Sequence, residues 1–480
     1  MQLLHLIRRD VVSKFAGEFL SRLVFLVFFF YVGRKIGSTD FGTLNLAISV
    51  TYMLGVIFLD PGLNLSTVQL LLGAREHAQQ IAGSILSAKL LLFLPTIIVL
   101  AVLSVGFGTR LPSFPVLTLG ALYALLTVIL EYLCSVTNAY HRMDLEAYLK
   151  ICNRLLIVLF GVVSLKMGGV AALLGAMVMA TFAASVIAWF VLGRRLLWVI
   201  PHWHFSSIKE ALRIGLPIAA AAIIGTIYLK WDLVVLSYFN IGREQIGWYA
   251  GAFKIVEAFS ALPGILGAGL YPIMIELRQR DPRSLDRLLG LTTKAVLVFS
   301  IPAAATVSLF SRQIVLWVYG VNYVPGASVL AVLIWCIVPI FLYFYLVFVN
   351  IIAGHAAYNL FAGCMALVVG LIANTLLVPR IGYLGAAWSA LSANSAFAML
   401  AAWKVSRLFQ NSALPGMFSR VLTAGGCMMA MFLLLPAPVP LQWLLGLAVY
   451  FVALVVLGSL GSADLSLMIR LLQFRAQPQE

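Results

Sequence analysis

The sequence contains few charged residues, few cysteines and no long polar segment. Only 10% of its 480 residues are Asp, Glu, Lys or Arg, whereas 62% are hydrophobic, and the mean hydropathy is +1.04. Soluble domains carry about a quarter charged residues, so this composition excludes a soluble globular protein. The apolar runs do not alternate with polar residues, which excludes a transmembrane β-barrel. The chain is therefore predicted to be an all-α polytopic membrane protein.

Several chemical classes also lack their signatures. No Walker loop or dinucleotide fingerprint is present, and the connections are too short to fold as catalytic domains, so we expect no enzyme and no cofactor. His202 and His204 have no further ligand nearby and fit an interfacial segment better than a metal site. The cysteines form no C-x-x-C pair and are expected to be small buried hydrophobes: Cys134, Cys152, Cys336, Cys364 and Cys427.

Apolar stretches of about 20 residues recur along the whole chain, the length that a helix needs to cross a bilayer. Polar residues between these stretches divide them into about fourteen predicted spans. The predicted ranges are 15–33, 41–65, 80–106, 114–137, 147–165, 169–192, 211–239, 246–274, 288–310, 326–353, 357–378, 382–405, 416–435 and 440–460.

Lys and Arg in the connections predict the orientation. Most lie on one set of alternate helix ends, which includes Arg194, Arg195, Arg278 and Arg280. Cytoplasmic loops carry this excess, so both termini are placed in the cytoplasm. The net charge of +15 is interpreted as this topology signal and as attraction to anionic membrane lipid, with no nucleic-acid partner.

An internal repeat organises the chain. The turns GSTDFG, 37–42, and GREQIG, 242–247, match at an offset of 205, and His141, Gly168 and Trp189 match later residues at an offset of 214. One repeat covers six spans, which predicts two parallel pseudo-symmetric six-helix lobes. The predicted domains are 1–195, 196–410 with an interfacial linker at 198–213, and 411–480 with two extra helices and an amphipathic tail.

Charged residues inside the predicted spans are candidate functional residues, because each is costly in lipid. Four of them, on four helices of the first lobe, come out about 10–14 Å from the cytoplasmic ends at 1.5 Å per residue. These are Arg22, Lys89, Glu131 and Arg154. The second lobe adds Lys230, Asp232, Lys254 and Glu257, nearer mid-depth.

Two interpretations of these charges stand side by side. In the first, Arg22, Lys89, Arg154, Lys230 and Lys254 line a cationic cavity that binds an anionic headgroup, since Arg and Lys bind phosphate. In the second, the charges pair and lock helices together, as Glu18 can with Arg22, Glu131 with Arg154, and Lys254 with Glu257. Asp60, in FLDPGLN, is interpreted as a turn residue that ends a helix.

Four segments resemble a known family. They are GRKIGSTDFGTLNLA, LDPGLNLSTVQLL, NAYHRMDLEAYLKICNRLL and VYGVNYVPGASVLAVLIW. Together they are similar to the polysaccharide-biosynthesis flippases, the O-antigen and exopolysaccharide branch of the multidrug/oligosaccharidyl-lipid/polysaccharide exporter superfamily. Arg22 lies where the resemblance implies first-helix arginines in a cationic cavity, and Glu18 beside it departs from a purely basic lining.

The resemblance implies a twelve-helix core with two additional helices that moves undecaprenyl-diphosphate-linked oligosaccharide across the inner membrane by alternating access. Proton or sodium coupling through Glu18, Glu131, Asp232 or Glu257 stays open. A polysaccharide polymerase and a chain-length regulator are expected partners of a monomeric chain. The alternatives are a cell-wall precursor flippase, a multidrug or cation antiporter of the same superfamily, and a membrane-embedded polymerase or ligase, which the short outer loops disfavour.

Overall fold

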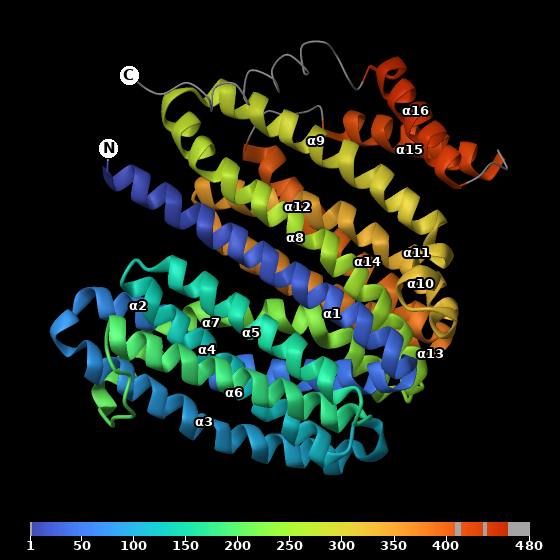
Figure 1. The fold of residues 1–480 in the computed structure, drawn as a ribbon. Helices are drawn as coiled ribbons and strands as arrows, with labels where there is room; N and C mark the ends of the chain where they lie inside the picture. Colours follow the sequence, from blue (N-terminus) through green and yellow to red (C-terminus); the bar gives the residue numbers. More distant parts are fainter. Residues whose placement is uncertain (1, 409–413, 435–438, 459–480) are drawn as a thin grey trace. The chain divides into compact units, whose positions relative to one another are not determined.

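The computed structural model describes residues 2–408, 414–434 and 439–458, with side chains described from residue 20 onward apart from shorter gaps. Within these residues every regular element is a helix (Figure 1). The all-α class predicted from the sequence is therefore confirmed.

The first helix, α1 (Gln2–Leu54), joins two of the predicted spans. Its backbone leaves the helical conformation at Gly37, with φ 82° and ψ 170°. Glycine reaches positive φ without the steric penalty that a Cβ imposes, so the chain bends here at little cost. The bend lies in the GSTDFG turn that the sequence places between the spans at 15–33 and 41–65.

A second break follows α1. A π-helical turn, Gly55–Leu59, leads into Asp60, Pro61 and Gly62, and α2 (Leu63–Gly73) begins after them. Gly62 is left-handed, with φ 78°, and Asp60 Oδ1 accepts a hydrogen bond from the Asn64 backbone N–H at 3.0 Å. Asp60 thus occupies the helix-ending turn that the sequence indicated, and its carboxylate caps the start of α2.

The remaining helices follow in order, and over the residues that the structure describes each of the fourteen predicted spans falls on one or more helices. They are α3 (Ala78–Phe107), α4 (Phe114–Ala139), α5 (Met143–Ser164), α6 (Val170–Arg195), α7 (Phe205–Tyr238), α8 (Arg243–Arg280), α9 (Pro282–Leu309), α10 (Ser311–Val318), α11 (Ala327–Leu333), α12 (Ile337–Ile352), α13 (Ala356–Ile381), α14 (Tyr383–Leu408), α15 (Leu414–Leu434) and α16 (Val439–Val456). Among the described residues, eight helical stretches are long and apolar enough to cross a membrane. The chain is a multi-pass membrane protein.

The helices form two compact units. Unit 1 comprises 1–258, 315–329 and 367–389, and unit 2 comprises 259–314, 330–366 and 390–480. The division into lobes at 195 and 410 stays a prediction.

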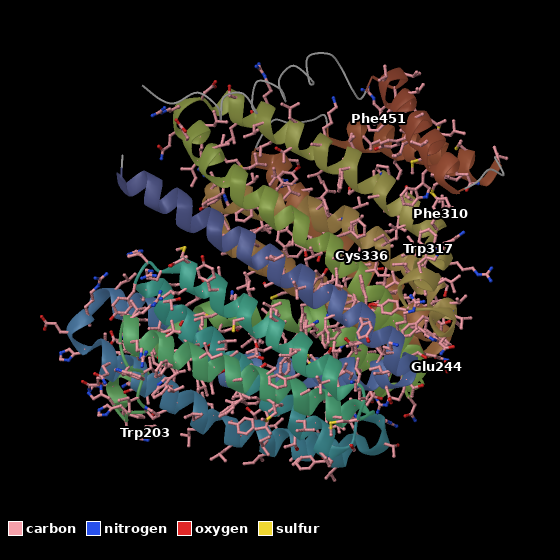
Figure 2. All side chains as sticks on the ribbon, in the orientation of Figure 1. Trp203, Glu244, Phe310, Trp317, Cys336 and Phe451 are labelled. Atoms are coloured by element: carbon pink, nitrogen blue, oxygen red, sulfur yellow. The ribbon has the colours of Figure 1, made fainter. Side chains whose placement is uncertain are left out.

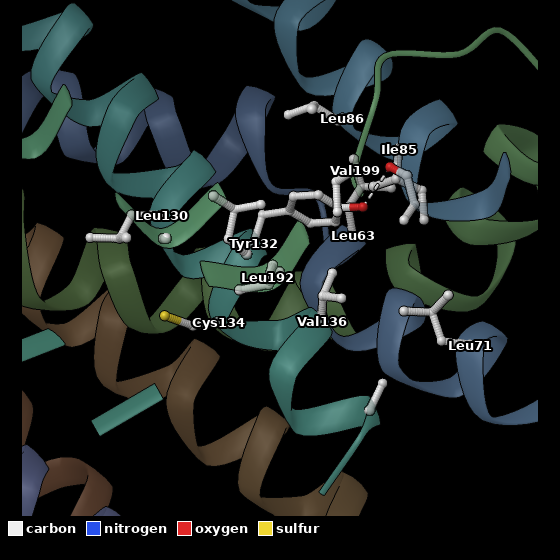
Figure 3. Packing of buried hydrophobic residues seen from close by; sticks show 14 of the residues in the cluster. Leu63, Leu71, Ile85, Leu86, Leu130, Tyr132, Cys134, Val136, Leu192 and Val199 are labelled. Carbon is white, nitrogen blue, oxygen red and sulfur yellow. Dashed lines mark hydrogen bonds between the residues drawn. The ribbon is translucent and has the colours of Figure 1, made fainter. Parts of the chain in front are cut away.

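The core of unit 1 is packed around α4. Tyr132 is fully buried there, and its hydroxyl donates a 2.6 Å hydrogen bond to the Ala82 carbonyl of α3 (Figure 3). Leu63 of α2 and Leu192 of α6 belong to the same buried cluster. This packing fixes α2, α3, α4 and α6 against one another and gives the charged residues of unit 1 a rigid support.

The segment before α7 is anchored to the same core. The His202 backbone N–H donates to the Gly83 carbonyl of α3 at 3.3 Å, and Trp189 Nε1 of α6 donates to the Val199 carbonyl at 2.8 Å. Trp203 is 61% exposed and points away from the ribbon (Figure 2). Exposed aromatic residues of this kind suit the interfacial position predicted for 198–213.

Unit 2 is held by packing between α9, α12, α15 and α16. The Tyr450 hydroxyl of α16 donates to the Val298 carbonyl of α9 at 3.0 Å, and Thr293 of α9 shares a hydrogen bond with Tyr345 of α12. Phe310, labelled in Figure 2, stacks edge-on against Phe432 of α15. The predicted charged site residues whose side chains are described all lie in unit 1.

Candidate functional site

Two aromatic rings on one face of α1 support cations from two other helices. The Arg154 guanidinium of α5 lies 4.0 Å from the centre of the Phe25 ring, and the Lys254 ammonium of α8 lies 4.9 Å from the centre of the Phe29 ring. Phe25 and Phe29 are four residues apart and their rings contact each other at 4.6 Å. Helical periodicity puts Arg22, which is exposed, on the same face. α1 therefore gathers three of the predicted cations.

The contact with a ring leaves the guanidinium able to bind a ligand. A cation over a ring is attracted to its π face, whereas the five N–H donors of arginine point outward in the guanidinium plane. Arg154 is only partly exposed, so an acceptor in its plane would bind with little competition from bulk water. Arg154 can therefore give a phosphate two parallel hydrogen bonds.

Lys254 and Glu257 form the ion pair that their spacing on α8 permits, at 2.7 Å. The Lys254 side chain is 13% exposed and that of Glu257 is 45% exposed. Glu257 also interacts electrostatically with Lys230 and Arg22. The exposed Glu257 carboxylate thus interacts with three cations, one each from α1, α7 and α8. The net charge of this group is positive.

Lys230 lies on α7 with its ammonium 5.6 Å from the centre of the Phe253 ring of α8. Its electrostatic partners include Glu257 and Lys254. Lys230 thus belongs to the same charged group as the α8 pair. Four of the five predicted cations, Arg22, Arg154, Lys230 and Lys254, are held either beside aromatic rings or around Glu257.

The fifth predicted cation, Lys89, is placed differently. It is fully buried on α3, and its ammonium is 2.9 Å from Asp60 Oδ1 and 3.2 Å from the Leu59 carbonyl. The Tyr132 ring lies 5.6 Å from it. The pair ties α3 to the break before α2, and the role of Lys89 in binding a headgroup stays a prediction.

Glu131 on α4 is exposed and interacts electrostatically with Lys150, Asp60, Arg154 and Lys89. Lys150 itself pairs with the buried Glu146 of α5 at 2.8 Å. Glu131 thus interacts both with the buried pair of Lys89 and Asp60 and with Arg154.

Asp232 on α7 is buried and lies in a hydrogen-bond network. Its two carboxylate oxygens accept hydrogen bonds from the Tyr249 hydroxyl of α8 at 2.6 Å and from Asn374 Nδ2 of α13 at 2.9 Å. These bonds join three helices of unit 1. The side chain of Glu18 lies outside the described residues.

Sequence reasoning did not identify Tyr52 or the Glu146 and Lys150 pair. Tyr52, on α1, is 39% exposed and interacts electrostatically with both Glu131 and Glu257. A neutral tyrosine within an apolar span gives no signal in a search for charge. Lys150 lies at the predicted cytoplasmic end of the span 147–165, where a lysine is expected, so its pairing on α5 gave no signal.

No group of three or more His, Cys, Asp or Glu side chains among the described residues is arranged to hold a metal ion. None of the five cysteines forms a disulfide bond; Cys134 and Cys336 are buried as predicted, Cys152 and Cys364 are partly buried, and the prediction was wrong for Cys427, which is exposed. The described side chains of unit 1 provide a group of cations beside aromatic rings, and the excess charge around Glu257 is positive. This arrangement is suited to binding an anion.

Comparison with solved structures shows which fold this arrangement belongs to. The chain is similar to the lipid II flippase MurJ in an inward closed conformation, with a TM-score of 0.75 and 14% identity over 95% of this chain and 99% of that one. It is also similar to an inward-facing multidrug resistance MATE family transporter of the MOP superfamily, with a TM-score of 0.61 and 17% identity over 82% and 100%. At this identity the likeness shows the fold, and these relatives are a flippase and a transporter rather than enzymes.

The sequence comparisons identify the family. Curated protein sequences give no match to the chain. The family model described as polysaccharide biosynthesis protein matches residues 7–278, which is more than half of the chain and contains all the predicted site residues. The chain belongs to the polysaccharide biosynthesis protein family.

Proposed function

We propose that the protein is a flippase that moves undecaprenyl-diphosphate-linked oligosaccharide repeat units from the cytoplasmic to the periplasmic leaflet by alternating access. The cargo would belong to an O-antigen, exopolysaccharide or capsule pathway. The observation that carries the proposal is the placing of Arg154 and Lys254 over neighbouring rings of α1. The family and the fold are consistent with it.

The chemistry of the cargo matches this arrangement. A diphosphate is a compact anion with acceptor oxygens on both phosphorus atoms, and it needs cations at depth once it leaves the headgroup region. Arg154 and Lys254 supply that charge beside two neighbouring rings of α1, and Arg22 and Lys230 add to it. The polyprenyl tail is as apolar as the bilayer and has no need to leave it.

A cell-wall precursor flippase is the second candidate. The fold match to the lipid II flippase favours it, because a lipid II headgroup would carry the same diphosphate chemistry. A multidrug or cation antiporter, the third candidate, would be expected to depend on acids in an apolar pocket, and the positive surplus around Glu257 argues against it. Neighbouring genes separate the first two: glycosyltransferases and a chain-length regulator favour the polysaccharide pathway, and cell-division genes favour the cell wall.

Energy coupling forms part of the proposal. Glu131 and Glu257 are exposed acids beside the cations, so either is suited to carry a proton or bind sodium between the two leaflets. Asp232 is the buried alternative. Transport measured in vesicles with imposed pH or sodium gradients tests this point, and transport that is indifferent to both gradients contradicts it.

Charge removal tests the function itself. In cells that lack the native protein, we expect Arg154→Gln and Lys254→Gln to abolish surface polysaccharide and to leave lipid-linked repeat units in the inner leaflet, at unchanged protein abundance. Arg194→Gln is the matched control, because Arg194 also lies over a phenylalanine ring, that of Phe190 at 4.2 Å, at the end of α6. Normal polysaccharide in both test variants contradicts the proposed site.

A further inference from the structure

The segment VYGVNYVPG, 318–326, contributes two tyrosines that stand between α1 and α8. Tyr319 and Tyr323 are 3% and 1% exposed, and their rings stack at 4.7 Å with an interplanar angle of 21°. The Tyr319 hydroxyl donates to the Gly251 carbonyl of α8 at 3.1 Å, and the Tyr323 hydroxyl donates to the Gly33 carbonyl of α1 at 3.0 Å. The stacked pair therefore holds both helices at once, from a third segment of unit 1.

Glycines on both helices make room for the rings. A Cβ at Gly33 would come within 2.7 Å of the Tyr319 ring, and a Cβ at Gly251 would come within 3.3 Å of both tyrosine rings. A side chain at Gly33 would thus overlap the Tyr319 ring, and one at Gly251 would press against both rings. The buried Phe41 ring closes the contact, with its centre 5.9 Å from that of Tyr319 and 6.1 Å from that of Tyr323.

Beyond the tyrosines, the two matching turns of the internal repeat meet. A Cβ on Gly42 would clash with the Arg243 carbonyl, and a Cβ on Gly247 would clash with the Ser38 carbonyl. Ser38 Oγ also lies 3.3 Å from Glu244 Oε1. The backbones of α1 and α8 thus touch at this end of unit 1, and only glycine permits the approach.

On the other side of the tyrosines lies the charged site. Phe29 is one turn of α1 from Gly33, and Lys254 is one turn of α8 from Gly251. The ring of Phe29 supports the Lys254 ammonium at 4.9 Å. The tyrosine pair therefore separates the cations from the end of the helices where Gly42 and Gly247 meet.

We propose that Tyr319 and Tyr323 are a plug that closes the outward end of the transport path and leaves its two carbonyl acceptors when the cargo passes. The inference rests on the proposed function for the direction of the path. Tyr323 lies within a short 3-10 helix, Val321–Gly326, and Tyr319 directly precedes Gly320, whose φ is 96°. Two side-chain hydrogen bonds and a stacking contact are weak enough to open and close repeatedly.

Accessibility of a cysteine on the cation side of the plug tests it. In a variant whose five native cysteines are replaced, Tyr52→Cys is the reporter, and a membrane-impermeant maleimide is added outside spheroplasts. We expect Tyr319→Phe and Tyr323→Phe each to raise the labelling rate about two- to tenfold, because each removes one hydrogen bond of the closed state and keeps the ring.

Tyr132→Phe is the matched control. Tyr132 is also a buried tyrosine that donates to a helix carbonyl, but it joins α4 to α3 and not α1 to α8. We expect Tyr132→Phe combined with Tyr52→Cys to be labelled at the same rate as Tyr52→Cys without a further substitution. Equal labelling in all variants, or a rise that Tyr132→Phe shares, overturns the plug. So does labelling from the cytoplasmic side only.

A cross-link tests whether α1 and α8 have to separate. With Ser38→Cys and Glu244→Cys in the same background, a short reducible bis-thiosulfonate reagent should stop polysaccharide export, and a reductant should restore it, while each single cysteine variant is unaffected. Normal export by cross-linked protein overturns the inference. Labelling does not depend on the cargo, so a chain that shows the labelling response without exporting polysaccharide contradicts the proposed function alone.

Discussion

The Arg154 guanidinium lies 4.0 Å from the centre of the Phe25 ring, so a cation of α5 rests on an aromatic side chain of α1. Arginine can rest on an aromatic ring and still present its N–H donors as a planar fork to an acceptor. Lysine at position 154 would keep the positive charge but could not give a phosphate two parallel hydrogen bonds. We therefore expect Arg154→Lys to retain only a minor share of export, with cargo binding weaker by about 1–2 kcal/mol, the difference between a bidentate and a single charged hydrogen bond.

Export and binding are measured separately for this variant. Purified protein in detergent is titrated with farnesyl diphosphate, and thermal stabilisation reports binding of the diphosphate. Arg194→Lys serves as control, since it makes the same change over the ring of Phe190. Equal binding by Arg154→Lys and the unmodified protein contradicts a bidentate role.

Glu257 competes with the cargo for Lys254. The two side chains pair at 2.7 Å, and a phosphate that binds Lys254 has to displace the carboxylate. Glu257→Gln removes the competing charge, so we expect tighter binding of farnesyl diphosphate, by about two- to tenfold, together with slower export because release is hindered. The exposure of Glu257 screens the pair and keeps the effect modest. Weaker binding by Glu257→Gln, measured by the same thermal titration, indicates that Glu257 orients the cation instead.

The buried pair of Lys89 and Asp60 allows a prediction about protein stability that does not depend on the cargo. Lys89 is fully buried and Asp60 is 21% exposed, so removing the cation leaves a carboxylate with little solvent and no matching charge at 2.9 Å. We expect Lys89→Met to lower the free energy of unfolding by about 3 kcal/mol, the lower part of the range for broken buried pairs. Adding Asp60→Asn should recover most of this loss, as the thermal midpoint in detergent will show. A double variant no more stable than Lys89→Met would mean that the lysine acts through packing.

The sequence was sufficient to predict the helices but not the pairing of the charges. Spans follow from local hydropathy, and over the described residues each predicted span falls on helices, with a break inside the span 41–65 at Asp60 to Gly62. The partner of Lys89 is 29 residues away and depends on the π-helical turn and the left-handed Gly62, which set the position of Asp60. The contacts of the cations with aromatic rings could not be predicted either. Phe25 and Phe29 lie in a run of apolar residues, and periodicity does not show which residues of other helices contact them.

The matching glycines of the repeat provide the last prediction. Alanine at Gly42 would bring its Cβ against the Arg243 carbonyl and the Gly247 nitrogen, which are backbone atoms that no side-chain rotation can move. We expect Gly42→Ala to destabilise the protein by about 1–3 kcal/mol, as overpacking does, and to raise outside labelling of Tyr52→Cys because α1 and α8 are pushed apart. Gly73→Ala is the control, since nothing lies within 4 Å of its added Cβ and alanine favours the helix. If the two variants have equal thermal midpoints and labelling rates, the approach of α1 to α8 at Gly42 is not tight in the membrane, and the closed end must depend on the tyrosines alone.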